Sequence, residues 1–161
     1  MADMLSAQRE FEAALRDYRV ALKIREQLVA KDAENSRWQS DLALSHDNIG
    51  KVRLAQGDAP EALREFRIAL AGREKLAAKD PNNAGAQRDL ASINAEIGGA
   101  LIGQGQIESG LGAYQVALAI LEALAAKEPG SAAVQRDLQA LRRKIDQARA
   151  EPPVTGSGPK P

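Results

Sequence analysis

The string QRDL stands at residues 87–90 and again at 135–138, and the related string QSDL stands at 39–42. Each string begins 48 residues after the one before it. A fixed period of this kind is typical of proteins that stack copies of one supersecondary unit. If the chain is such an array, its core and turn positions must repeat with the same step.

Core, cap and turn positions do repeat with the step of 48 residues, and we call positions related by it equivalent. The step aligns three of the five aromatic residues, which are Tyr18, Phe66 and Tyr114. It also aligns pairs of residues that mark turns or close contacts, namely Gly50 with Gly98, Gly57 with Gly105, and Pro81 with Pro129. The good helix N-caps that it aligns are Asn35, Asn83 and Ser131. The sequence therefore predicts a tandem array.

Each repeat is predicted to contain two helices. From residue 36 to about residue 56, apolar residues fall at helical spacings of three, four and seven, at Trp38, Leu42, Ile49 and Val52. Gly57 is expected to end this helix in the left-handed conformation, and Asp58 to cap the next one. Applied along the chain, the period predicts about six helices of roughly 20 residues, over 9–31, 36–56, 59–79, 84–104, 107–127 and 132–150.

The stretch NIGKVRLAQGDAPEALREFRIAL, residues 48–70, resembles the centre of a tetratricopeptide repeat. The matching residues are Ile49-Gly50 in the first helix, Gly57-Asp58 at the turn, and Ala62, Phe66 and Ala69-Leu70 in the second helix. The usual unit has about 34 residues, so each helix here is about two turns longer. The resemblance implies an all-α, right-handed solenoid of antiparallel helix pairs. The long-helix form looks like repeats found in bacterial multidomain signalling proteins.

Residues 1–150 are expected to form one repeat domain with incomplete repeats at its ends. Helix 9–31 matches the second helix of a repeat, and the two complete repeats are 36–79 and 84–127. Helix 132–150 matches a first helix, but Asp146 stands where the two preceding first helices have Gly50 and Gly98. We expect this last helix to cap the array. The segment 151–161 is rich in proline and glycine and is expected to be a disordered tail.

The composition argues against several classes of partner. The 22 basic residues balance the 22 acidic ones, so no net charge attracts the chain to nucleic acid or to an anionic membrane. The start of the sequence lacks the pattern of a signal peptide, and no run of about eighteen apolar residues occurs. The chain has no cysteine and therefore no disulfide or thiolate chemistry. We expect a cytoplasmic protein without a membrane segment.

No constellation of residues predicts an active site. The single histidine, His46, is equivalent to Asn94 and Arg142, and we interpret it as a surface or groove-edge residue. The three equivalent aspartates lie in the early turns of their helices, where a carboxylate complements the helix dipole, and they are Asp41, Asp89 and Asp137. No metal-ligand spacing or phosphate-binding loop occurs. We expect a non-enzymatic protein without cofactor or metal.

The resemblance implies that the first helices of the pairs line a concave groove that binds a peptide or a segment of a partner protein. A helical wheel places one set of residues opposite the core stripe of these helices. The predicted groove residues are Leu44, Asp47, Lys51, Leu54, Arg88, Ser92, Ala95, Gly99, Ile102, Arg136, Arg143 and Gln147. Four of them are basic and one is acidic, so we expect an acidic, partly apolar ligand. The alternative is that these side chains are only solvated.

Self-association is a second hypothesis. Apolar residues follow one side of helix 9–31, at Phe11, Leu15, Tyr18 and Leu22. Part of this stripe would meet a preceding first helix in a full array, and an uncovered apolar helix face favours a symmetric homodimer. The alternative is that the next repeat covers the whole stripe.

The stretch IGGALIGQGQIESGLGAY, residues 97–114, contains six glycines. Glycine inside a helix lowers its stability by about 0.5–1 kcal/mol relative to alanine. These glycines therefore either permit close helix contacts or make this repeat a hinge.

Overall fold

The computed structural model describes the backbone of residues 2–150 and their side chains, apart from the side chains of residues 2–7 and Arg9. Residues 2–150 form six helices and no strand: α1 (Ala2–Lys31), α2 (Ser36–Ala55), α3 (Ala59–Lys79), α4 (Ala84–Gly103), α5 (Ile107–Lys127) and α6 (Ala132–Ala150). The prediction of an all-α fold with six helices is confirmed. The predicted tail, 151–161, lies outside the described residues.

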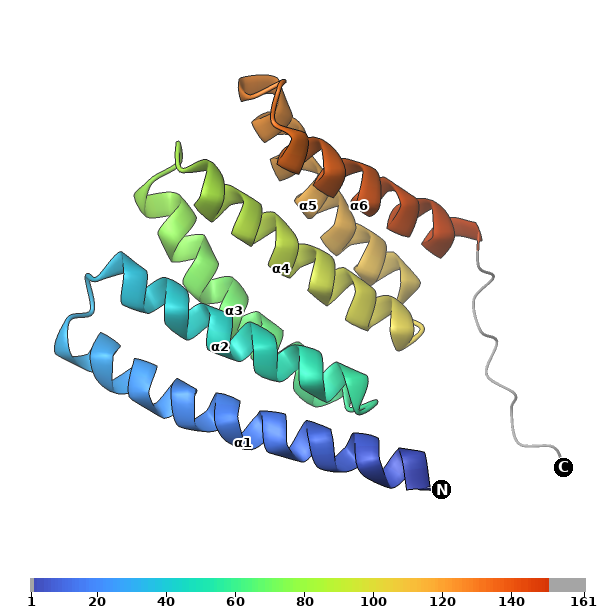
Figure 1. Ribbon diagram of the computed structural model, residues 1–161. Helices are drawn as coiled ribbons and strands as arrows, with labels where there is room; N and C mark the ends of the chain where they lie inside the picture. Colours follow the sequence, from blue (N-terminus) through green and yellow to red (C-terminus); the bar gives the residue numbers. More distant parts are fainter. Residues whose placement is uncertain (1, 151–161) are drawn as a thin grey trace, which may run out of the picture.

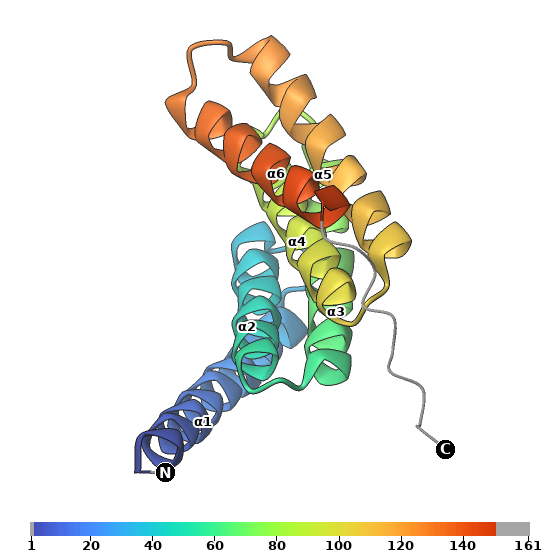
Figure 2. The same cartoon turned by 90° about the vertical axis from the view of Figure 1, so that its right-hand side faces the viewer.

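Each helix packs against the next one along the chain, and helices α2 to α6 form two layers (Figure 1 and Figure 2). Helices α2, α4 and α6 lie side by side in the front layer of Figure 1. Helices α3 and α5 lie behind them, as the side view in Figure 2 shows. This arrangement is a solenoid of helix pairs, in agreement with the predicted fold class.

The predicted cap and turn residues set the ends of the helices. The side chains of Asn35 and Asn83 accept hydrogen bonds from the backbone N–H groups three residues further on, and Asp58 does the same for the N–H of Glu61. Gly57 and Gly105 have φ angles of +81° and +77°. This left-handed conformation is favourable for glycine and ends α2 and α4 where the sequence predicts.

Close contact between a glycine and an aromatic ring fixes how the two helices of each pair approach. A Cβ atom added to Gly50 would lie 2.5 Å from Cε1 of Phe66, and one added to Gly98 would lie 2.5 Å from Cδ1 of Tyr114. Phe66 is 0% exposed and Tyr114 is 4% exposed. The absence of a side chain at Gly50 and Gly98 therefore lets the second helix place its ring against the backbone of the first.

The predicted start of the first helix is wrong. We expected a helix over 9–31, but α1 begins at Ala2 and runs through Arg9 without a break. Arg9 is equivalent to the turn glycines Gly57 and Gly105, and within residues 2–150 only those two residues have a positive φ. Because a turn of that kind disfavours arginine, the helix continues. The other five helices lie within one residue of their predicted ranges.

The core consists of two clusters of buried residues, one centred on α3 and α4 and the other on α5 and α6. Phe66, Ile93 and Ile97 belong to the first cluster, and Tyr114 and Leu138 belong to the second. The predicted core stripe of α2 is only partly correct. Ile49 is buried, whereas Trp38, Leu42 and Val52 are half-buried.

Candidate protein-binding groove

The front layer carries two neighbouring hollows. The first lies between α4 and α6 and has a volume of about 280 Å³, and the second has a volume of about 360 Å³ and reaches Leu54 of α2. Glu96 and Lys144 line both hollows, so the two form one continuous depression, which we call the groove. The first hollow is also lined by Arg88, Asp89, Ala91, Ser92, Ala95, Leu121, Asp137, Ala140 and Leu141, and the second by Leu54, Gly99, Ile102, Tyr114, Gln147 and Ala148.

The structure brings seven of the twelve predicted groove residues together in this groove. They are Leu54, Arg88, Ser92, Ala95, Gly99, Ile102 and Gln147. The other five do not line it, and they are Leu44, Asp47, Lys51, Arg136 and Arg143. Small side chains at Ala95 and Gly99 leave the depression open along α4.

The expectation that Asp47 faces a ligand is wrong, because its side chain is only 5% exposed. Its Oδ2 lies 3.3 Å from Nη2 of Arg73 on α3, and the side chain of Arg73 is 7% exposed. Nη1 of Arg73 lies 2.8 Å from Oδ2 of Asp89, so one guanidinium joins α2, α3 and α4. Within the described chain, Oδ1 of Asp47 and Nε of Arg73 are buried without a hydrogen-bond partner. Asp47 is therefore part of the helix packing.

Two of the predicted bases already have carboxylate partners. Nζ of Lys51 lies 3.1 Å from Oδ2 of Asp47 and 4.0 Å from Oε1 of Glu96. Arg88 donates from Nε and Nη2 to Oδ2 of Asp137, at 3.0 and 2.7 Å, and so ties α4 to α6. The charge of Lys51 and Arg88 is thus largely neutralised within the fold.

The basic residues of α6 are in a different situation. Arg143 and Lys144 are exposed and make no ion pair with any other residue that the structure describes. Nε of Arg136 donates to the backbone oxygen of Ala132 at 3.3 Å. Positive charge that is free to meet a ligand therefore lies along the α6 edge of the groove, where Lys144 is one of the lining residues.

Our interpretation of the sequence missed the acidic residues of the groove, Asp89, Glu96 and Asp137. With Arg88 and Lys144 they give the groove three acids and two bases, so it is not a basic channel. The strings QRDL at 87–90 and 135–138 could have indicated that Asp137 faces Arg88. The arginine of one string pairs with the aspartate of the next.

Tyr114 is a further groove residue that we did not predict as one. Its ring packs on Gly98, while its side chain also lines the second hollow. Burial raises the pKa of the Tyr114 phenol above its usual value of 10.0, and the negative charge of Glu96 raises it further. Tyr114 is therefore neutral at physiological pH.

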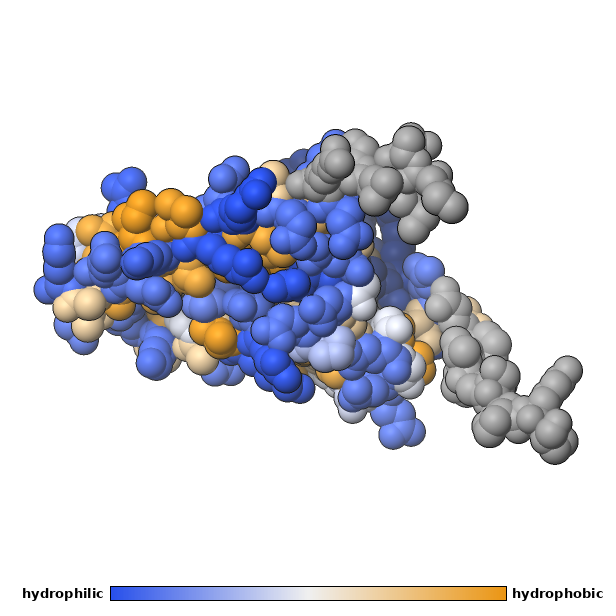
Figure 3. Space-filling view, turned by 90° about the horizontal axis from the view of Figure 1, so that it is seen from below, coloured by the Kyte–Doolittle hydropathy of each residue, from blue (hydrophilic) through white to orange (hydrophobic). Residues whose placement is uncertain are grey.

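The predicted self-association stripe is partly covered within the chain. Leu15 is 0% exposed and so cannot meet a second chain, whereas Phe11, Tyr18 and Leu22 are half-buried. From the α1 side the surface is mostly hydrophilic, with hydrophobic side chains gathered mainly toward one end (Figure 3). Among the described side chains of α1, the exposed large apolar residues are Val20 and Ile24, which the prediction did not include.

His46, which we interpreted as a surface or groove-edge residue, is half-buried and paired with a carboxylate. Its Nδ1 lies 2.7 Å from Oε2 of Glu65 on α3, and its side chain is only 12% exposed. Among the described residues, no group of three His, Cys, Asp or Glu side chains could hold a metal ion.

One described helix, α5, is long and apolar enough to cross a membrane by length and composition alone. We did not expect such a helix from the sequence. Core helices pass the same test, and one face of α5 packs into the core through Tyr114, Ala117, Leu121 and Leu124.

A family model for the tetratricopeptide repeat matches residues 1–32. The match supports membership of the tetratricopeptide repeat superfamily. It confirms the recognition drawn from residues 48–70, although the matched segment is α1, where the sequence departs from the repeat pattern. Tetratricopeptide repeats typically bind protein partners and are generally non-enzymatic, so the match suggests a protein–protein interaction scaffold. No curated protein matches the chain.

Proposed function

We propose that this chain is a non-enzymatic scaffold whose groove binds an extended or helical segment of a partner protein. The observation that carries the proposal is the continuity of the two hollows, which share Glu96 and Lys144 on one layer of helices. A groove of this kind is the usual form of a site for a peptide segment. The resemblance to long-helix repeats further supports a role as a cytoplasmic module of a larger bacterial signalling protein.

The charges of the groove indicate how the segment lies. Acidic side chains of the ligand meet Arg143 and Lys144 of α6, because these two bases have no carboxylate partner in the described chain. Apolar side chains of the ligand enter the second hollow beside Leu54, Ile102 and Tyr114. This arrangement keeps the predicted acidic, partly apolar ligand but leaves out Lys51 and Arg88, which are paired with carboxylates of the chain.

Selection from a random-peptide library on the full chain tests this function, with the enriched peptide then synthesised for titration. Lys144→Glu is expected to weaken its binding about tenfold or more, because the substitution places an acid against an acidic ligand. The matched control is Lys23→Glu, since Lys23 is an exposed base on α1, far from the groove residues in sequence and on another helix. Equal affinities of the two variants would contradict the proposal.

Self-association through α1 remains a second candidate because of a specific difference in burial. Ala14, Tyr18 and Ala21 of α1 are half-buried, whereas the equivalent residues of α3 are 0% exposed, and these are Ala62, Phe66 and Ala69. A dimer formed through this face is expected to dissociate when Tyr18 is replaced by aspartate. Light scattering behind size exclusion at two concentrations tests it, and unchanged mass would dismiss this candidate.

A further inference from the structure

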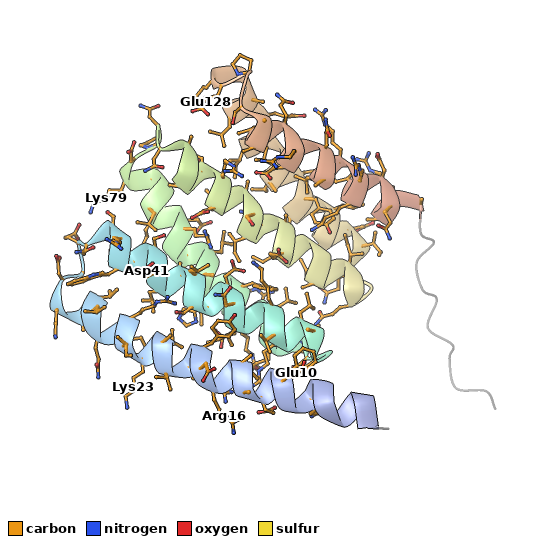
Figure 4. The ribbon with its side chains drawn as sticks, viewed as in Figure 1. Glu10, Arg16, Lys23, Asp41, Lys79 and Glu128 are labelled. Carbon is orange, nitrogen blue, oxygen red and sulfur yellow. The ribbon has the colours of Figure 1, made fainter. Side chains whose placement is uncertain are left out.

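The outer face of α5 differs from the outer face of α1. Each of α1, α3 and α5 exposes one β-branched residue at an equivalent position, and these are Val20 (62% exposed), Ile68 (51%) and Val116 (50%). On α1 the neighbours of this residue are Arg16 and Lys23, which point away from the helices (Figure 4). On α5 the equivalent neighbours are Gly112 and Ala119. The outer face of α5 therefore lacks the charged side chains that α1 has at the equivalent positions.

The uncharged residues of this face form a continuous seam along α5. Gly112, Val116, Ala119 and Ala123 are all exposed, and their spacings of four, three and four are those of a helix–helix contact. Glu122 lies beside the seam, but its carboxylate is paired with α6. Its Oε1 lies 3.0 Å from Nη2 of Arg142.

We propose that two copies of this chain associate through this seam, with their α5 helices antiparallel about a two-fold axis between Val116 and Ala119. The spacings of four, three and four residues are the same in both directions from that point. The axis places Val116 opposite Ala119 of the second copy and Gly112 opposite Ala123 of the second copy.

Charge complementarity at both ends of the seam supports a second copy as the occupant. The next residues of the series are Glu108 and Lys127, each four residues beyond the seam and both exposed. The same axis places Glu108 opposite Lys127 of the second copy, once at each end. A hydrogen bond of 3.3 Å from Nζ to Asn82 leaves Lys127 two further donors for this pair. A parallel pairing would instead set like charges against each other.

Shape complementarity supports the same occupant. A hollow of about 330 Å³ lies beside the seam and is lined by Ala119, Ile120, Ala123, Leu124 and Lys127 of α5 together with Pro81 and Gln87. Val116 of the second copy, which stands opposite Ala119, fits into this hollow as a knob into a hole. Because the axis is two-fold, each copy supplies one knob and one hole, as a symmetric contact requires.

The seam lies on a different helix layer from the groove, so this dimer is independent of the proposed ligand. One pair of helices buries less than a standard interface of about 1,600 Å², so we expect a dimer that dissociates on dilution. Sedimentation velocity of the full chain over a hundredfold range of concentration measures this. A monomer at every concentration would overturn the proposal.

A matched pair of variants localises the contact. Ala119→Glu places two carboxylates near the axis and is expected to raise the dimer dissociation constant about tenfold or more. Ala71→Glu is the control, because Ala71 is the equivalent exposed residue of α3. Equal weakening by both variants, or a dimer that responds only to Tyr18→Asp, would overturn the α5 contact.

Reversal of the end charges provides a test that loss of folding cannot imitate. Glu108→Lys and Lys127→Glu should each weaken the dimer, and the variant that carries both should regain the original dissociation constant. Failure of the double variant to recover would contradict the antiparallel pairing.

Cross-linking tests the orientation directly, since the chain has no cysteine of its own. A Cβ atom at Gly112 would have nothing within 4 Å, so Gly112→Cys is accommodated. A mixture of the Gly112→Cys and Ala123→Cys chains should form disulfide-linked dimers, whereas neither chain alone should. Cross-linking of Gly112→Cys alone would overturn the antiparallel register. Monomers that bind phosphatidylcholine–phosphatidylglycerol vesicles through α5 would show that the seam meets lipid instead.

Discussion

At the residue scale, the buried pair of Asp47 and Arg73 has apolar equivalents one repeat later, Ala95 and Leu121. A buried ion pair is often no more stable than apolar residues of similar size, whereas a buried charge without its partner is costly. Arg73→Leu is therefore expected to lower the free energy of unfolding by about 3 kcal/mol, since Lys51 still lies beside Asp47.

The double variant Asp47→Ala/Arg73→Leu copies the following repeat and should be about as stable as the original chain or more so. Urea unfolding of both variants measures this difference. A double variant as unstable as Arg73→Leu alone would contradict the account.

The contact of Gly98 with Tyr114 gives a second prediction at this scale. A methyl group at position 98 would meet both the ring and the backbone oxygen of Gly110, at 2.5 and 2.9 Å. Gly98→Ala should therefore destabilise the fold by about 1–3 kcal/mol. Gly103→Ala is the control, because a Cβ atom there would have nothing within 4 Å. Thermal unfolding should separate the two variants, and equal midpoints would speak against the close contact.

Tyr114 predicts a dependence of stability on alkaline pH. Its pKa is raised in the folded state, first by burial and then by Glu96. The unfolded chain therefore loses this proton at a lower pH than the folded chain. The contribution is complete below about pH 10 and is lost as the pH rises through the folded pKa. Tyr114→Phe should fall less steeply in stability between pH 9 and 11, and parallel curves for the two proteins would refute this.

At the element scale, the start of α5 lacks the side-chain cap that α3 has. Asp58 accepts a hydrogen bond from the backbone N–H of Glu61, whereas Gln106, the equivalent residue before α5, makes no capping hydrogen bond. Gln106→Asp is expected to stabilise the fold by about 1 kcal/mol, and Asp58→Gln to destabilise it by a similar amount. Chemical denaturation of the two variants tests this, and shifts in the same direction would be inconsistent with capping.

The glycine-rich stretch of α4 and α5 contains two kinds of glycine. Gly98 and Gly110 lie where two helices approach closely, whereas a Cβ atom at Gly103 or Gly112 would have nothing within 4 Å. Only the second pair is therefore free to soften the repeat. The hinge stays a prediction, and its expected sign is faster hydrogen exchange over 97–112 than over 49–64. Equal protection would reject it.

Turns and caps could be predicted because each depends on one or two adjacent residues. Gly57, Gly105, Asn35, Asn83 and Asp58 act as their residue types suggest. The start of α1 could not be predicted in the same way. The repeat pattern predicts a turn at position 9. The helix continues there because Arg9 stands in place of the turn glycine.

At the scale of the whole molecule, the period predicted the solenoid but not the charge pairs that cross it. The helical wheel treats each helix alone, so it placed Asp47 and Lys51 on an open face. Arg73 of α3 reaches under that face and removes Asp47 from solvent. Likewise, Arg88 and Asp137 meet only because α4 and α6 lie side by side. Such pairs depend on the spacing between helices, which the sequence of one repeat does not contain.

The capping role of α6 stays a prediction, and the glycine contacts bear on it. Position 146 is equivalent to Gly50 and Gly98, where even a Cβ atom would lie 2.5 Å from an aromatic ring. An aspartate side chain at position 146 leaves less room for a ring placed as those of Phe66 and Tyr114 are. The exposed bases of α6, Arg143 and Lys144, are available to a ligand in the groove.

The most direct test of the proposed function is a titration of the isotopically labelled chain with the selected peptide, followed by backbone amide NMR. Binding in the groove predicts that the largest shifts fall on Ser92, Ala95 and Gly99 of α4, and that Lys144→Glu reduces them. Shifts confined to α1 or to the outer face of α5 would contradict binding in the groove.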